Sequence, residues 1–135
     1  MEVIILILTG ILGSLTTYVL HNYLGQSDVR ASALPSLIVA LFFFIFPEIT
    51  SSFLQHKIPI IFIGASFVGM VSNKVLHHWL YIILAGAIFS IIYINLGSFF
   101  KGFGGSLGNV ACISVITTLG LATLKKHKGI KKRKK

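Results

Sequence analysis

The sequence predicts an all-α fold: a polytopic transmembrane helical bundle with five spans, its N-terminus outside and its C-terminus cytoplasmic. The chain is 55% hydrophobic and only 11% charged, whereas a soluble domain carries about a quarter charged residues. Its apolar residues fall into separate runs, and about 20 helical residues cross a hydrocarbon core of roughly 30 Å. These runs do not alternate apolar with polar residues, so they indicate helices rather than strands.

Five apolar runs define the expected spans. They are Val3–Tyr23, Ala31–Phe46, Ile58–Ser72, Trp79–Ser98 and Phe103–Leu124. Pro35 falls in the first turn of the second run, where proline is tolerated, and Pro47 ends or kinks that run. The third run is short, so it either spans a thinned bilayer or is re-entrant. A re-entrant third run leaves four spans and moves the N-terminus inside.

The basic residues are concentrated at the C-terminus. Of the 12 Lys and Arg residues, eight lie in a tail at 125–135, which we separate from a transmembrane domain at 1–124. The eight are Lys125, Lys126, Lys128, Lys131, Lys132, Arg133, Lys134 and Lys135. Such a cluster beside a span attracts anionic lipid headgroups and fixes topology. Because the rest of the chain is almost neutral, the charge argues for the bilayer as partner and against nucleic acid.

Charge also predicts the orientation. With five spans and the tail inside, the cytoplasmic side holds Arg30, Lys74 and the tail, while the outer side holds only Lys57 and Lys101. An excess of Lys and Arg in cytoplasmic loops is the usual rule. We therefore expect a multi-pass protein of the inner (plasma) membrane with its tail in the cytoplasm.

Small residues four positions apart occur in most of the runs. The pairs are Gly10/Ser14, Gly13/Thr17, Ala65/Gly69, Gly86/Ser90 and Gly104/Gly108. Four residues are about one helical turn, so each pair forms a groove that another helix can enter closely. The grooves serve either packing within one bundle or contact between subunits. A short chain has few internal faces for so many grooves, which favours a homo-oligomer.

The segment from Gly102 to Gly108 is the richest in glycine. It predicts close packing or an unwound helix start that exposes backbone to an ion or solute. Among polar residues within the runs, Asn109 and Ser66 are the best pair for lining a narrow polar path. The candidate pathway or packing residues are Ser66, Gly69, Gly104, Gly105, Gly108 and Asn109.

Several classes of chemistry find no support in the sequence. The glycine-rich segment lacks the Lys-Ser/Thr and the preceding strand of a P-loop. His21, His77 and His78 have no Cys or carboxylate at metal-ligand spacing, and Asp28 and Glu48 fall in loops assigned to opposite sides. A deep carboxylate, the usual mark of an energised carrier, does not occur in any expected span. The sequence thus predicts a non-enzymatic protein without metal or cofactor.

In layout, the chain resembles phage holins: a few glycine-rich apolar spans followed by a dense basic C-terminus. The resemblance rests on no sequence motif, and it implies a self-associating protein that opens a passive pathway or lesion for ions or small solutes. The alternative is a membrane-embedded receptor, adaptor or assembly factor that binds a membrane-protein partner through its loops or basic tail.

Overall fold

The computed structural model describes residues 1–71, 74–96 and 104–133, with side chains as far as His127. These residues form five helices and no strand: α1 (Glu2–Asn22), α2 (Asp28–Ile45), α3 (Ser52–Gly69), α4 (Trp79–Asn95) and α5 (Gly104–Arg133). The all-helical prediction is confirmed. Four of the helices, α1, α2, α3 and α5, are long and apolar enough to cross a membrane, while α4 is shorter.

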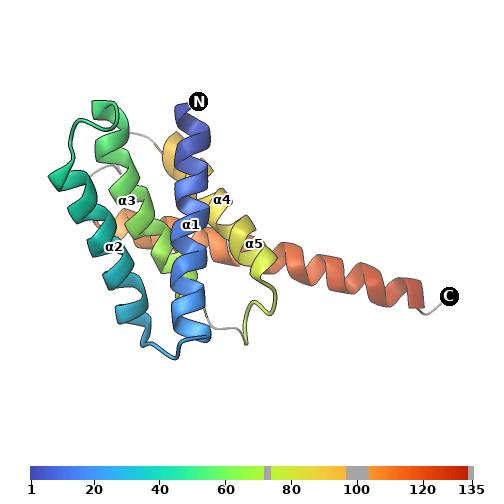
Figure 1. Cartoon of the computed structure of the whole chain (residues 1–135). Helices are drawn as coiled ribbons and strands as arrows, with labels where there is room; N and C mark the ends of the chain where they lie inside the picture. Colours follow the sequence, from blue (N-terminus) through green and yellow to red (C-terminus); the bar gives the residue numbers. More distant parts are fainter. Residues whose placement is uncertain (72–73, 97–103, 134–135) are drawn as a thin grey trace.

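Helices α1 and α3 form the centre of the bundle. Helix α3 packs against the four other helices, α1 packs against α2, α3 and α4, and α5 packs against α3 and α4. Figure 1 shows α5 crossing behind the other helices, and its C-terminal part extends beyond them. Within α5, buried residues occur from Ser106 to Thr118, and those from Leu119 to His127 are exposed or half-buried. The five runs therefore form five helices, but α5 crosses the others instead of running alongside them (Figure 1).

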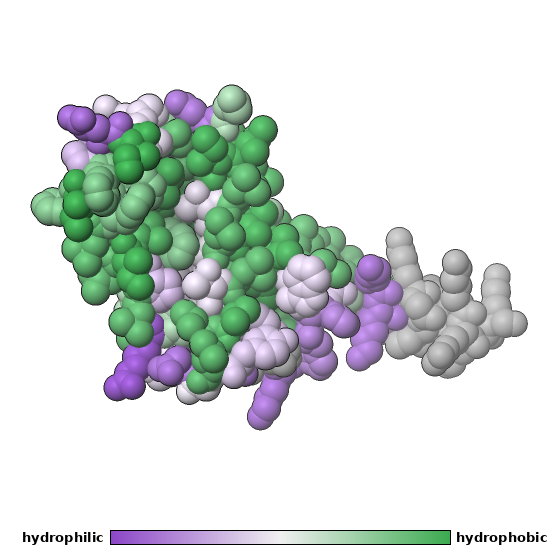
Figure 2. Space-filling view, viewed as in Figure 1, coloured by the Kyte–Doolittle hydropathy of each residue, from purple (hydrophilic) through white to green (hydrophobic). Residues whose placement is uncertain are grey.

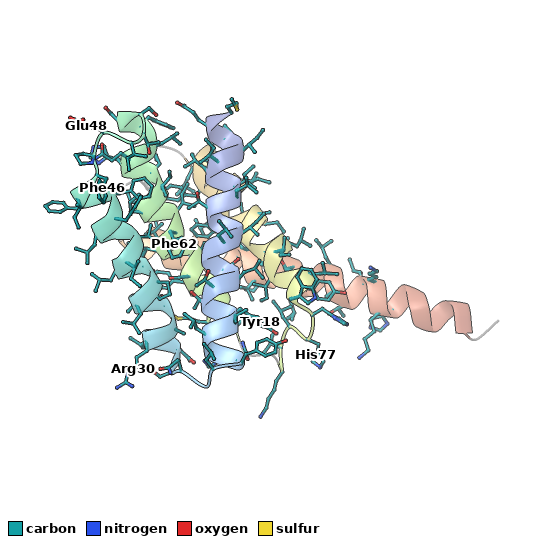
Figure 3. All side chains as sticks on the ribbon, in the orientation of Figure 1. Tyr18, Arg30, Phe46, Glu48, Phe62 and His77 are labelled. Atoms are coloured by element: carbon teal, nitrogen blue, oxygen red, sulfur yellow. The ribbon has the colours of Figure 1, made fainter. Side chains whose placement is uncertain are left out.

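Polar and apolar surfaces divide along the bundle. Figure 2 shows apolar residues over the middle of the visible face and hydrophilic residues gathered at the two ends of the bundle and where α5 begins to project. Glu48 lies at the end that carries the N-terminus, and Arg30 and His77 lie at the opposite end (Figures 1 and 3). An apolar middle between two polar ends is the surface that a helical membrane protein presents to lipid.

Two helices begin earlier than the sequence indicated. Helix α2 begins at Asp28, so Pro35 lies well inside it rather than in its first turn, and α3 begins at Ser52 and contains Pro59. The polar residues Gln55, His56 and Lys57 were assigned to a loop and belong to α3. Helix ends that reach the headgroup region can carry polar residues. The expectation that the third run is the short one was therefore wrong.

The α1–α2 connection is tight. Helix α1 ends at Asn22, and Gly25 adopts a left-handed backbone conformation with φ 64°, which glycine reaches without steric cost. The Nδ1 atom of His21 lies 2.8 Å from Oδ1 of Asp28 and 3.1 Å from the carbonyl oxygen of Gln26. These contacts hold the first two helices as an antiparallel pair.

Candidate functional site

Helices α1 and α4 meet through two facing pairs of small residues. A Cβ atom added to Gly10 would lie 3.0 Å from the Gly86 carbonyl oxygen, and one added to Gly86 would lie 2.9 Å from the Gly10 oxygen. The Ser90 hydroxyl is 3.1 Å from the Gly86 oxygen and 3.4 Å from the Leu6 oxygen. The Gly10/Ser14 groove of α1 thus packs directly against the Gly86/Ser90 groove of α4.

Helices α1 and α3 meet in the same way. A Cβ atom on Gly13 would lie 3.0 Å from the Phe62 oxygen and 3.3 Å from the Ala65 Cβ. One on Gly69 would meet the Ser14 oxygen and would lie 2.7 Å from the Thr17 Cβ. The Gly13/Thr17 and Ala65/Gly69 grooves therefore also serve packing within one chain. The hydroxyl of Thr17 is fully buried in this contact and has no hydrogen-bond partner among the described residues.

Ser66 links α2 to α3. Its Oγ lies 2.6 Å from the Ser32 Oγ and 2.6 Å from the Ile63 carbonyl oxygen, and the Ser36 hydroxyl donates to the Ser32 carbonyl at 2.7 Å. All three serines are buried. Asn109, which the sequence paired with Ser66, is exposed on α5. The structure does not bring the two residues together.

The buried face of α5 is a stripe that sequence reasoning missed. It repeats every four residues through Ser106, Val110, Ser114 and Thr118. Ser114 and Thr118 donate back to carbonyl oxygens four residues earlier, at 2.7 and 2.8 Å, so their hydroxyls are satisfied within α5. The signal was present as small residues at four-residue spacing, but the glycines drew attention to the neighbouring face.

The opposite side of α5 is open. We call Gly105, Gly108, Asn109 and Cys112, all of them exposed, the open face. A Cβ atom on Gly105 or Gly108 would meet nothing within 4 Å. The Asn109 amide makes no hydrogen bond within the part of the chain that the structure describes. Residues 104–108 are helical, so the expected unwound start is wrong over that stretch, while Gly102 and Phe103 lie outside the described residues.

The inside of the bundle is filled. A cavity of about 70 Å³ lined by Lys57, Tyr93 and Leu6 lies toward the N-terminal end, and a larger groove lies at the other end, beside His77. Between them Ala65, Val68, Ala85 and Phe89 are completely buried. Tightly packed interiors leave no room for a water file. Among the described residues, these buried side chains close the line between the cavity and the groove.

The Lys57 side chain of α3 packs against two aromatic rings. The Lys57 Nζ lies 5.7 Å from the ring centroid of Phe53 and 5.6 Å from that of Tyr93, both within the range of cation–π attraction. Helix α3 thus carries a lysine that the sequence placed in a loop. This position, in the second turn of α3, keeps the charge near one end of the bundle.

The described residues hold no group of three or more His, Cys, Asp or Glu that could bind a metal ion. The tail lysines Lys125 and Lys126 continue α5 without a break, and the helix runs on to Arg133. Side chains of Lys128, Lys131, Lys132 and Arg133 are not described, and Lys134 and Lys135 lie outside the described residues.

Comparison with known proteins adds no relative. No protein-family model, curated protein or solved structure matches the chain.

Proposed function

We propose that the chain is a non-enzymatic integral membrane protein that associates with copies of itself through the open face of α5. The observation that supports this is the contrast between glycine grooves. The grooves of α1, α3 and α4 are filled within the chain. On α5, Gly105 and Gly108 are open and lie beside the Asn109 amide, which has no hydrogen-bond partner among the described residues. In lipid, close packing of small residues and hydrogen bonds between polar side chains drive helix association.

A passive pathway for ions or small solutes then forms between copies. The described residues fill the middle of one copy. The α5 surface offers Asn109 and the exposed Thr117, whose hydroxyl already donates to the Ile113 oxygen at 2.7 Å. Several such helices around an axis would give a weakly polar lining without charge. That composition fits a passive pathway or lesion rather than an energised carrier.

Cross-linking through the single cysteine tests the association. Cys112 lies on the open face, so bridging of two copies by a short bis-maleimide, which adds one thiol to each of its two rings, should give a covalent dimer in membranes. Gly108→Leu fills the face and should reduce the dimer several-fold, while Gly120→Leu makes the same change at another open position of α5 and should leave it intact. Cys112→Ser removes the only thiol and is the negative control, which should give no covalent dimer. Equal dimer yield in both leucine variants would contradict association through this face.

Flux from proteoliposomes tests the pathway. Asn109→Ala removes the amide without adding bulk, so it should change the rate or selectivity of ion release while Cys112 cross-linking persists. Gly108→Leu should lower flux together with the dimer. If the protein forms an oligomer but releases no ion under any gradient, self-association would stand and the pathway would be refuted.

An adaptor is the second candidate function, and the length of α5 favours it. This helix has 30 residues, or about 45 Å, and its basic end projects beyond the bundle (Figure 1). Such an arm could bind an acidic surface of a membrane-protein partner. A monomeric mass in mild detergent, with no cross-linking through Cys112, would favour this function.

We propose that the end of the bundle with Arg30, His77 and Lys125 faces the cytoplasm of a bacterial-type inner membrane, with the N-terminus outside. Basic residues favour the inner side. A reporter fused after Leu124 should therefore be cytoplasmic, and one inserted at Glu48, at the opposite end, should be external. Reporters on the same side at both positions would refute this orientation.

A further inference from the structure

A groove of about 550 Å³ lies between the α3–α4 connection and the second half of α5. We call it the cationic groove. Its polar lining residues are His77, His78, Tyr81, Thr123, Lys125 and Lys126. Figure 3 places His77 at the end of the bundle that also carries Arg30. Residues more than 40 positions apart in sequence thus form one surface, so it depends on the fold and not on the tail alone.

The charge of the groove selects an anion. Lys125 and Lys126 each carry an ammonium group, and the two imidazoles donate an N–H even when neutral. None of the lining residues is acidic. Of the three acidic residues in the chain, Asp28 contacts His21, while Glu2 and Glu48 belong to the opposite end. No carboxylate of the described chain therefore competes for these cations.

The rest of the groove is apolar. Val75, Leu76, Leu119 and Ala122 contribute to its lining. Helix α4 begins at Trp79 without a side-chain cap, so the positive end of its dipole lies beside His78. Trp and Tyr at this level mark the border between headgroups and hydrocarbon. A ligand with an anionic head and an apolar chain would match both halves of the groove.

We propose that the cationic groove binds one anionic phospholipid. Its phosphate would lie among Lys125, Lys126, His77 and His78, and an acyl chain would follow Leu119 and Ala122 along α5. This differs from the diffuse attraction between a basic tail and an anionic surface, which depends only on the number of charges. It is also independent of self-association, because the open face of α5 contributes no residue to the groove.

The single tryptophan reports occupancy. Trp79 follows His78 directly and its side chain is 56% exposed. In phosphatidylcholine vesicles, brominated phosphatidylglycerol should quench Trp79 fluorescence more strongly than brominated phosphatidylcholine at the same mole fraction. General exposure of Trp79 to lipid would give equal quenching, and that result would overturn the proposal.

Matched variants separate the groove from the tail. Lys125→Gln/Lys126→Gln and Lys131→Gln/Lys132→Gln remove the same charge. The first pair should raise the phosphatidylglycerol fraction needed for half-quenching by about fivefold per lysine, and the second should leave the preference nearly intact. If both double variants lost the phosphatidylglycerol preference equally, binding would depend only on the number of charges, and this would contradict a specific site. His77→Gln/His78→Gln keeps every lysine and should also weaken the preference for phosphatidylglycerol. If this variant kept the full preference, the α3–α4 connection would not be part of the site.

A free phosphate could satisfy the same cations. Inorganic phosphate should therefore be added at constant ionic strength while quenching by brominated phosphatidylglycerol is followed. Unchanged quenching supports a lipid held by both its head and its chain. Complete recovery of fluorescence would assign the groove to a free anion and overturn the lipid proposal.

Discussion

Replacing Gly69 by leucine is expected to destabilise the bundle strongly. The new side chain would meet the Ser14 carbonyl oxygen, and even its Cβ would lie 3.0 Å from the Tyr18 nitrogen. Backbone atoms of a helix cannot yield as a flexible side chain does, so α1 must move away from α3. Overpacking typically costs about 1–3 kcal/mol, and because α1 also holds α2 and α4 we expect the upper part of that range.

Thermal unfolding in mild detergent measures this effect. Gly120→Leu is the control, because a Cβ atom there would meet nothing within 4 Å. It should leave the midpoint within error of the unmodified protein, while Gly69→Leu should lower it by several degrees. Identical midpoints for the two variants would mean that α1 and α3 do not pack through the Gly13/Thr17 and Ala65/Gly69 grooves.

Phe89→Ala is expected to have the largest effect among truncations. Phe89 is completely buried, its ring lies 6.1 Å from that of Tyr93 with an interplanar angle of 9°, and it fills the space that Gly64 leaves. Removing a buried phenyl ring from a soluble core costs about 3–5 kcal/mol. In lipid the transfer part of this cost falls, since the solvent is also apolar, but the lost packing remains. We expect about 3 kcal/mol, the low end of that range.

Phe44→Ala makes the same chemical change on the outside. Phe44 is 82% exposed on α2, so its truncation removes contacts with lipid and few within the bundle. Denaturant or steric-trapping measurements should separate the two variants clearly. A cost at Phe44 equal to that at Phe89 would contradict the assignment of α2's outer face to lipid and of α4's inner face to the core.

The helices themselves could be predicted because apolar runs of membrane length have few alternatives. The starts of α1, α4 and α5 were predicted within one residue. Those of α2 and α3 were not, because Asp28 and Lys57 are polar residues that hydropathy assigns to loops, although both lie in helices. At the end of α2 the prediction came within one residue, since Pro47 cannot continue the helix that ends at Ile45.

The groove pattern was predictable, but its pairing was not. Four-residue spacing identified four close-packing pairs on α1, α3 and α4. The structure shows that Gly10/Ser14 faces Gly86/Ser90 and that Gly13/Thr17 faces Ala65/Gly69. Spacing alone does not tell which side of a helix faces the bundle. For α5, the serine and threonine stripe is inside and Gly108 outside, because Val110 belongs to the buried core and Leu107 packs beside Gly64 of α3.

The cationic groove lay beyond sequence reasoning for another reason. His77 and Lys125 are 48 positions apart, and their proximity depends on how α5 crosses the bundle. Each residue alone was interpretable as an interfacial side chain. Only the placement of the second half of α5 against the α3–α4 connection makes the pair a candidate site.

The central place of α1 has a consequence for biosynthesis. This helix is synthesised before α4, and the Ser90 hydroxyl that contacts its Leu6 carbonyl comes 84 residues later. At synthesis rates of roughly 5–20 residues per second, α1 must remain in the insertion machinery or the bilayer for several seconds before α4 can fill its Gly10/Ser14 groove. A nascent chain that stops before α4 would leave the Gly10/Ser14 groove exposed to other membrane proteins.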